Sequence, residues 1–452
     1  MDLSQEVQNK HVYKLDSIVY DLPGVCWLSK KGLDSNMTEP FRFYENPRSM
    51  QRGCTDASEL SSAMFEAARK EISSWPNYRP TPLISLSGLA KAKGVGTILY
   101  KDEGGRFGLG SFKALGGAYA VCRVLQAAIV DRMGVSPSSE ELRQGRFRNI
   151  TETITVTTAT DGNHGRSVAW GANQFHCRCV VYVPNNCSRN RELAIARHGA
   201  QVVRSAAGYD ETVRQCLQEA EARGWLPVSD TSWGDNEKIP ATVMQGYTVM
   251  TREVLDQLAA TKRPTHVFVQ AGVGGLAGAV CAFFSEAWGV RRPRMIVVEP
   301  SGAACMFASA LAGKRVSLDE VQSIMVGLES GEASPLAWRL LEQGTDFFMT
   351  VPDSVVPDCM RLLAASPHGD PPIVAGESAV AGLAGLLYLL DNPALRTKLE
   401  LDSTSSILLL GTEADTDPDL YSKLVGMSAD QVRRRADLAE HRVPEPGSVS
   451  IS

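Results

Sequence analysis

The sequence predicts an α/β protein with mostly parallel sheets. From Arg79 onward, short apolar strands alternate with amphipathic stretches of helical period, which is the pattern of strand–helix–strand units. Polar and glycine residues follow many of these strands, where sheets of this kind bind their ligands. With 452 residues, 44% of them hydrophobic, the chain is long enough for two or more domains.

The elements expected along the chain begin after an N-terminal extension, residues 1–77, which acts as an arm or a lid and contains a helix from Ala57 to Ser73. Strands are expected at Thr97–Lys101, Ile154–Thr158, Cys179–Val183, Gln201–Arg204, Leu226–Ser229, His266–Gln270, Met295–Glu299, Phe348–Val351 and Ile407–Leu410. Helices between them are expected at Phe112–Ala127, Gly165–Gln174, Glu211–Ala222 and Ala241–Leu258. Residues 441–452 are expected to form a polar tail.

Composition argues against several classes of function. A formal net charge of -5 gives no basic surface for nucleic acid. The N-terminus lacks the features of a signal peptide and no apolar run approaches a membrane span, so a cytoplasmic protein is expected. The ten cysteines are scattered without a CxxC pair, so neither a metal site nor disulfides are expected.

A glycine-rich turn precedes Lys113, in the stretch Arg106-Phe-Gly-Leu-Gly-Ser-Phe-Lys113-Ala-Leu-Gly-Gly117. A lysine held there in a partly dry pocket has a lowered pKa and a nucleophilic amine, which suits a Schiff base. The alternative is a solvated surface lysine. The glycines on both sides favour the reactive lysine, because they let the backbone turn tightly around it.

A second glycine-rich segment, Gly272-Val-Gly-Gly-Leu-Ala-Gly278, follows a buried strand and opens a helix, which suits an anion such as phosphate. A dinucleotide is one interpretation, with Glu299 as the ribose-binding acid. Close helix–strand packing without a ligand is another. Pyridoxal phosphate is favoured, because it needs both a phosphate site and an imine-forming lysine.

Several motifs together resemble the fold-type II pyridoxal-phosphate enzymes, the superfamily of tryptophan synthase β and threonine dehydratase, and within it the diaminopropionate ammonia-lyases. The resemblance runs from about Tyr78 to about Gly426. It rests on Tyr78-Arg-Pro-Thr-Pro-Leu83, the Lys113 turn, Thr160-Asp161-Gly-Asn-His-Gly165, Gln270-Ala-Gly-Val-Gly274, Glu377-Ser378, Gly411-Thr-Glu-Ala-Asp-Thr-Asp417 and Asp230-Thr-Ser-Trp233.

The resemblance implies a role for individual residues toward the cofactor. Lys113 would hold pyridoxal phosphate as a Schiff base, and Asn163 would bind its 3′-oxygen. Gly272, Val273, Gly274 and Gly275 would bind the phosphate. Thr412 would face the pyridine nitrogen as a neutral hydroxyl, which favours elimination.

The resemblance also places Asp161 and Asp230 beside an amino-acid substrate. Two carboxylates favour a substrate with a second ammonium group, 2,3-diaminopropionate, and their mutual repulsion raises at least one pKa. Asp161 is expected to take the Cα proton of the D-isomer and Lys113 that of the L-isomer, giving pyruvate and ammonia. From the residues alone, Asp161 could instead cap a helix, and His164 is a packing or phosphate-side residue.

The family pattern further implies two open twisted sheets flanked by helices and a homodimer. The large cofactor domain is expected at residues 78–120 and 235–440, and a smaller mobile domain at 121–234. Gly110, Ser111, Gly275 and the segment from Arg143 to Thr151 depart from the pattern, which leaves the substrate open. The alternatives are a dehydratase or β-replacement enzyme acting on serine, threonine or a similar amino acid, an NAD-binding oxidoreductase and a non-catalytic binding protein.

Overall fold

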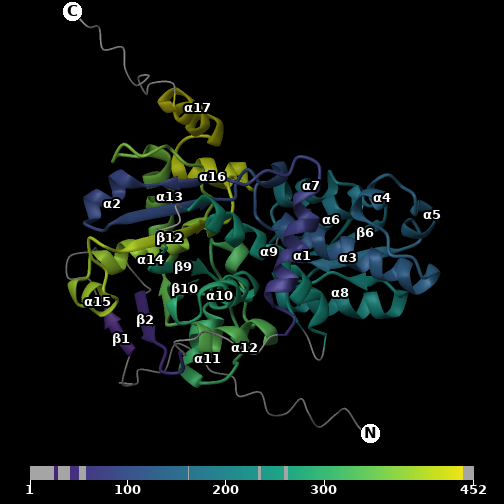
Figure 1. Cartoon of the computed structure of the whole chain (residues 1–452), viewed down its shortest axis with the longest axis horizontal. Coiled ribbons are helices and arrows are strands. Elements are labelled where there is room, and N and C mark those ends of the chain that lie inside the picture. The colour runs from purple at the N-terminus through teal and green to yellow at the C-terminus, as the bar shows by residue number, and fades with distance from the viewer. Residues whose placement is uncertain are drawn as a thin grey trace, which may run out of the picture.

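The protein has two lobes that lie side by side, each built on its own sheet (Figure 1). The larger lobe carries α10 to α16, the smaller carries α3 to α6 and α8, and α1 and α9 lie at their junction. The computed structural model describes residues 25–28, 41–49, 58–160, 162–232, 236–258 and 263–440.

The sheet of the larger lobe has eight strands in the order β1-β2-β11-β10-β9-β12-β4-β3. Its five central strands, from β11 to β4, are parallel, and β1, β2 and β3 add antiparallel pairs at the two edges. The strands are β1 (Val25–Leu28), β2 (Phe41–Glu45), β3 (Leu83–Ser85), β4 (Thr97–Asp102), β9 (His266–Gln270), β10 (Arg294–Pro300), β11 (Phe347–Val351) and β12 (Ser406–Gly411).

The sheet of the smaller lobe is parallel throughout, in the order β7-β6-β5-β8. Its strands are β5 (Thr155–Ala159), β6 (Arg178–Val183), β7 (Gln201–Arg204) and β8 (Leu226–Pro227). The predicted α/β class with two mostly parallel sheets is confirmed, and each of the nine predicted strands is present. The edge strands β1, β2 and β3 were not predicted.

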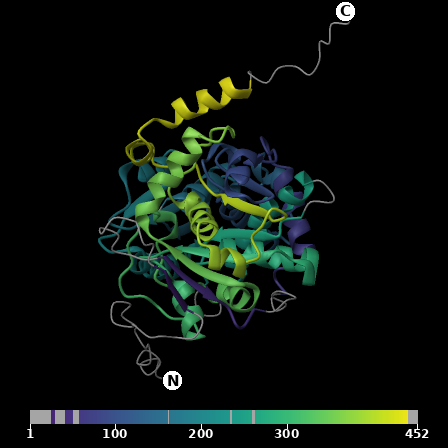
Figure 2. The same ribbon diagram turned by 90° about the vertical axis from the view of Figure 1, so that its left-hand side faces the viewer.

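Helices cover both sheets. They are α1 (Ser62–Ser73), α2 (Ser87–Lys93), α3 (Ala114–Met133), α4 (Ser139–Arg143), α5 (Arg148–Thr151), α6 (Asn163–Gln174), α7 (Arg189–Ala196), α8 (Tyr209–Arg223), α9 (Lys238–Gln257), α10 (Gly275–Trp288), α11 (Cys305–Ala312), α12 (Pro335–Gly344), α13 (Val356–Ala365), α14 (Ala381–Leu390), α15 (Pro393–Lys398), α16 (Pro418–Val425) and α17 (Ala429–Glu440). Figure 2 shows α17 projecting from the body of the protein.

Successive side chains of the central strands point into two different cores, because a strand alternates its faces. On β9, Val267 and Val269 join the core formed with α3, α9 and α10. Phe268, between them, joins the core formed with α13 and α14. The larger sheet is therefore buried on both faces, which leaves the ends of its strands as the place for a ligand.

Helix α3 is long and apolar enough to cross a membrane by length and composition, with 67% of the relevant window buried in the protein. The expectation that no apolar run approaches a membrane span is therefore wrong by this measure. The helix packs against α6 and α9, and residues such as Leu115, Val121 and Leu125 are fully buried there. Its apolar character is that of a core helix.

The domain division stays a prediction. All four strands of the smaller sheet lie inside the predicted range 121–234. The predicted boundary between residues 120 and 121 falls within the continuous helix α3. The predicted tail, residues 441–452, lies outside the described residues, as does the start of the helix expected from Ala57.

Candidate active site

A pocket lies where the carboxyl ends of strands from both sheets meet. It is lined by Phe112, Lys113, Asn163, Tyr209, Asp230, Tyr247, Gln270, Ala271, Gly272, Val273, Gly274, Gly275, Leu276, Gly327, Leu328, Glu329, Ser330, Ser378, Thr412 and Glu413. Every cofactor residue expected from the sequence lies in this lining, together with Asp230. Most of these residues lie in the three segments that directly follow β8, β9 and β12. In parallel sheets, residues just beyond the carboxyl ends of the strands are the ones that bind ligands.

The glycine-rich turn before Lys113 is held against the end of β12. The amide of Phe112 donates to the carbonyl of Thr412 at 3.1 Å, and the amide of Ala414 donates to the carbonyl of Gly110 at 2.9 Å. Gly108 and Gly110 have φ angles of 71° and 74°, in the left-handed region that favours glycine. The turn thus positions Lys113 immediately before α3.

Lys113 forms an ion pair with Asp230 inside the pocket, with Nζ 2.6 Å from Oδ2. Their side chains are 19% and 8% exposed. Burial alone would raise the pKa of Asp230, but the Lys113 ammonium outweighs it and, with His164 nearby, lowers that pKa to about 2. The expectation of a raised pKa is therefore not met at Asp230.

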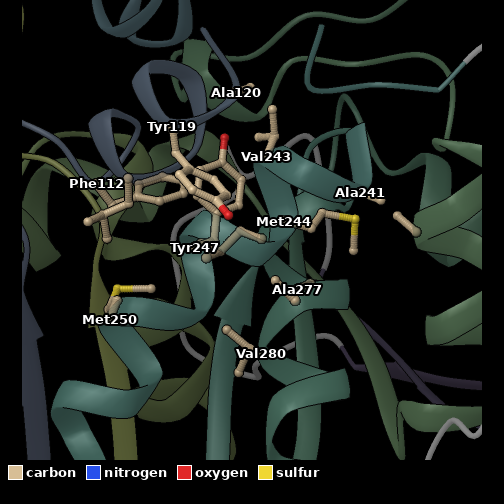
Figure 3. Packing of buried hydrophobic residues seen from close by; sticks show 14 of the residues in the cluster. Phe112, Tyr119, Ala120, Ala241, Val243, Met244, Tyr247, Met250, Ala277 and Val280 are labelled. Atoms are coloured by element: carbon tan, nitrogen blue, oxygen red, sulfur yellow. The ribbon is translucent and has the colours of Figure 1, made fainter. Parts of the chain in front are cut away.

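Two aromatic rings flank the lysine. Its Nζ lies 5.6 Å from the Phe112 ring centroid and 5.8 Å from the Tyr247 ring centroid. The two rings are 4.7 Å apart and lie beside each other in Figure 3, with Tyr247 rising from α9. The sequence predicted a helix at this place but gave no signal for Tyr247, because a tyrosine on a helix most often packs in a core.

His164 is buried beneath the ion pair. Its Nε2 lies 2.8 Å from the carbonyl oxygen of Val228 and its Nδ1 lies 3.8 Å from Oδ2 of Asp230. Because a carbonyl only accepts, Nε2 carries the hydrogen. Burial lowers the pKa of His164, with a partly opposing effect from Asp230. Its contacts are with the peptide chain after β8 rather than with the glycine segment.

The segment Gly272–Gly275 joins β9 to α10 and fits a phosphate. In the part of the chain that the structure describes, none of its four amides donates a hydrogen bond. Gly274 has a φ of 94°, and a Cβ there would come within 2.1 Å of Met306 Cε. The α10 N-terminus adds a favourable dipole, so these amides can bind an anion.

Asn163 begins α6, and its side-chain amide donates to Oε2 of Glu413 at 2.5 Å. The other carboxylate oxygen of Glu413 accepts from the amide of Ser378 at 3.1 Å. Glu413 therefore fixes the position of Asn163 at the wall of the pocket. In the sequence, Glu413 stands out only as part of the Gly411-Thr-Glu-Ala-Asp-Thr-Asp417 motif.

Thr412 directly follows β12, and its hydroxyl lies 2.8 Å from Nε2 of Gln270. Both side chains are buried, at 4% and 2% exposure. A neutral hydroxyl thus lines the pocket where the resemblance implied one.

Asp161, which the resemblance places beside the substrate, lies outside the described residues, as does Trp233 of the Asp230-Thr-Ser-Trp233 motif. Glu299 is fully buried away from the pocket, and its oxygens accept from the amides of Met306 and Phe307 at 2.8 Å and 2.7 Å. Glu299 therefore caps α11, and the dinucleotide interpretation loses its ribose-binding acid.

Behind the glycine-rich turn lies a second set of charges, the turn-anchoring cluster, composed of Thr81, Lys101, Glu103, Arg106 and Glu253. Arg106 donates to both carboxylates through four contacts of 2.8 Å, and Lys101 Nζ lies 2.7 Å from Glu253 Oε2. All four charged side chains are at most 4% exposed. The cluster joins β4 and the turn to α9.

An ion pair links the two lobes beside the pocket. Arg191 of α7 donates to Glu377, and both side chains are buried. Burial and the nearby Glu413 carboxylate raise the pKa of Glu377 to about 7, although Arg191 opposes the shift. Asn190, on the same helix, donates to Asp417 at 3.2 Å.

The described residues contain no group of three or more histidine, cysteine or acidic side chains that could hold a metal ion. Eight cysteines are free thiols: Cys122, Cys177, Cys179, Cys187, Cys216, Cys281, Cys305 and Cys359.

Comparison with known proteins identifies relatives of the whole fold. The family model "Pyridoxal-phosphate dependent enzyme" matches residues 75–412. A diaminopropionate ammonia-lyase of Salmonella typhimurium is 39% identical over 77% of this chain and 89% of its own length. The Escherichia coli protein of the same name is 38% identical over 81% of this chain and 92% of its own.

Solved structures of diaminopropionate ammonia lyase from Escherichia coli resemble this fold. The crystal structure of the Escherichia coli diaminopropionate ammonia lyase with an aminoacrylate–PLP azomethine reaction intermediate matches with a TM-score of 0.77 and 35% identity, covering 86% of this chain and 97% of that one. The same enzyme with D-serine gives a TM-score of 0.78 and 36% identity, with 85% and 96% coverage. A tomato threonine deaminase, at 22% identity and a TM-score of 0.61, covers 87% of this chain and 92% of its own and shares the fold.

Proposed function

Because the chain belongs to the pyridoxal-phosphate dependent enzymes, in their diaminopropionate ammonia-lyase family, we propose that it eliminates ammonia from 2,3-diaminopropionate. The products are pyruvate and two molecules of ammonia. The observation that carries the proposal is the Lys113–Asp230 ion pair at 2.6 Å, which faces the glycine segment across one pocket.

Pyridoxal phosphate, when bound, withdraws electrons from the amino acid so that a Cα proton and a β-substituent can leave. We assign Lys113 as the residue that attaches it covalently and the amides of Gly272, Val273, Gly274 and Gly275 as its phosphate site. The four amides without partners in the described chain support this assignment. Asn163 is assigned to the 3′-oxygen and Thr412 to the ring nitrogen.

Asp230 is proposed to bind the β-ammonium group of the substrate. In the structure the Lys113 ammonium lowers the pKa of Asp230 to about 2, so its carboxylate is ionised, and the β-ammonium group of the substrate would take the place of that cation once Lys113 holds the cofactor. An ionised, mostly buried carboxylate attracts an ammonium group strongly. This favours a diamino acid over serine, whose β-hydroxyl is neutral.

Removal of the Cα proton is assigned to Lys113 for the L-isomer and to Asp161 for the D-isomer. The amine of Lys113 can accept a proton once the substrate has displaced it from the cofactor. Phe112 and Tyr247 exclude water from this amine, which strengthens its electrostatic contacts.

The test is an absorbance titration of the purified protein with pyridoxal phosphate, followed by assays of pyruvate and ammonia. Substrates are D- and L-2,3-diaminopropionate, D- and L-serine and L-threonine. We expect a visible band that requires Lys113, with two ammonia per pyruvate from diaminopropionate. Turnover of serine or threonine alone would identify a dehydratase, and no band at all would overturn the proposal.

We also propose a homodimer in the cytoplasm and a small domain, residues 121–234, that closes on the substrate. The Arg191–Glu377 ion pair supports this division, because it joins the two lobes beside the pocket. Light scattering of the holoenzyme tests the dimer. Small-angle scattering with and without D-serine tests closure, and identical profiles would contradict it.

A further inference from the structure

Gln270 is the last residue of β9 and one of the residues that line the pocket. Nε2 is 2.8 Å from the carbonyl oxygen of Leu410 and 2.8 Å from Oγ1 of Thr412. Gln270 is 2% exposed, so neither contact competes with bulk water.

The network determines which way round the amide lies. The carbonyl oxygen of Leu410 can only accept, so the atom facing it must be the NH₂ group. That group has two hydrogens, and its two short contacts are to Leu410 and Thr412, whereas the carbonyl oxygen of Ala379 is farther away at 3.5 Å. Oγ1 of Thr412 therefore accepts a hydrogen bond from Gln270.

The hydroxyl hydrogen of Thr412 must then point elsewhere. Among the described residues, the hydroxyl of Thr412 donates no hydrogen bond to an acceptor, and Thr412 lines the pocket. A buried hydroxyl without an acceptor is unfavourable, so this hydrogen is available to a ligand in the pocket.

The oxygen of the Gln270 amide supplies an independent observation. Oε1 is buried and has no hydrogen-bond partner among the described residues. An apolar side chain would avoid that loss, so the favourable contribution of this amide comes from its NH₂ group. Among the described residues, the only hydrogen bonds of the Gln270 side chain shorter than 3 Å are the two that its NH₂ group donates to Leu410 and Thr412.

We propose that Gln270 is a positioning residue that makes the Thr412 hydroxyl a hydrogen-bond donor toward the cofactor ring nitrogen and so keeps that nitrogen unprotonated. The inference rests on the proposed function, which assigns Thr412 to the ring nitrogen. A protonated ring nitrogen would be a donor and would need an acceptor. If Oγ1 of Thr412 were that acceptor, the hydrogen of the Thr412 hydroxyl would be buried without a partner.

The consequence concerns reaction type. An uncharged ring accepts less negative charge than a pyridinium, so the electrons released at Cα are better carried away by the departing β-group. Gln270 would therefore favour elimination over simple exchange of the Cα proton, and it would do so through its hydrogen bond to Thr412.

The test uses holoenzyme reconstituted with pyridoxal phosphate that carries ¹⁵N in its ring, and measures the ring ¹⁵N chemical shift from pH 6 to 9. In wild type we expect the shift of an unprotonated pyridine at every pH. In Gln270→Glu the new side chain accepts from Thr412 instead of donating, so the shift should move toward that of a pyridinium. Exchange of the Cα proton of alanine in D₂O should rise relative to elimination.

Gln270→Met removes both donors and provides a second variant in case the buried glutamate prevents folding. It should make the ring nitrogen shift pH-dependent. Gln126→Glu is the matched control, because Gln126 is also buried and donates to a carbonyl, that of Pro137 at 3.0 Å, away from the pocket. It should leave the ring shift unchanged.

A pyridinium shift in wild type, or a ring shift that neither Gln270 variant changes, would overturn the inference while elimination by wild type left the proposed function standing. A wild-type protein that binds no pyridoxal phosphate would overturn both.

Discussion

Two groups of buried charge lie on either side of the glycine-rich turn, and they differ in how many contacts hold each charge and in how far it is exposed. In the turn-anchoring cluster two cations meet two carboxylates, and Arg106 alone makes four contacts to them. In the pocket one lysine meets one carboxylate, and Lys113 keeps 19% of its side chain exposed. Several contacts in full burial make the first group structural, whereas a single ion pair beside open space leaves the second able to react.

The largest expected effect breaks the pocket pair. Lys113→Ala should lower elimination by more than about 10³-fold, because it removes the covalent attachment and one of the bases. The visible band and pyruvate formation measure this. The melting temperature without cofactor should also fall, because the variant leaves the buried Asp230 carboxylate without its cation. Residual activity within about 10-fold of wild type would contradict the assignment.

The turn-anchoring cluster should respond in the opposite way. Glu253→Gln leaves two buried cations with one carboxylate and should destabilise the protein by about 3–5 kcal/mol. Thermal unfolding of the protein without cofactor measures it.

Glu152→Gln is the matched control for this prediction, because Glu152 pairs with Arg148 on the surface, where the two side chains are 53% and 59% exposed. A surface pair contributes about 0–1 kcal/mol. If Glu253→Gln and Glu152→Gln lose the same free energy of unfolding, the turn-anchoring cluster does not stabilise the fold more than a surface ion pair does.

Asp230→Asn separates substrate binding from lysine chemistry. Loss of the charge that faces the β-ammonium group should reduce kcat/KM for diaminopropionate roughly 30-fold to several thousand-fold. This factor corresponds to a loss of about 2–5 kcal/mol in transition-state stabilisation. D-serine lacks that ammonium and should be affected much less. Steady-state kinetics measures the loss of kcat/KM for each of the two substrates. An equal loss for both would show that Asp230 acts only by positioning Lys113 and does not bind the β-ammonium group.

The smallest expected effect concerns an acid with no cation beside it. Burial raises the pKa of Glu299 to about 8, although the amides of Met306 and Phe307 oppose the shift. The folded state therefore binds the proton more tightly than the unfolded state, whose glutamates titrate near 4.5. Stability should fall as pH rises from about 4.5 to about 8.

Glu299→Gln removes this titration, so the stability difference between wild type and variant should change by about 1 kcal/mol between pH 7 and pH 8. Denaturant unfolding at pH 7 and pH 8 measures it, with Glu152→Gln as the control. Parallel pH profiles for wild type and Glu299→Gln would show that Glu299 is ionised in the folded protein at both values.

The sequence by itself determined the nine main strands, the α/β class and most of the pocket. Strands such as His266–Gln270 could be predicted because their residues are apolar over a short run and are followed by glycines. Lys113 and the Gly272–Gly275 segment could be identified because each chemical role depends on a local motif.

Only the tertiary structure decided which distant residues meet. Glu253 completes a cluster with Arg106, which lies 147 positions earlier in the chain. Tyr247 reaches Lys113 from α9. The antiparallel edges β1, β2 and β3 likewise exist through pairing with strands elsewhere in the sheet. Such contacts leave no periodic trace in the sequence, because each depends on where a helix or strand packs rather than on its neighbours along the chain.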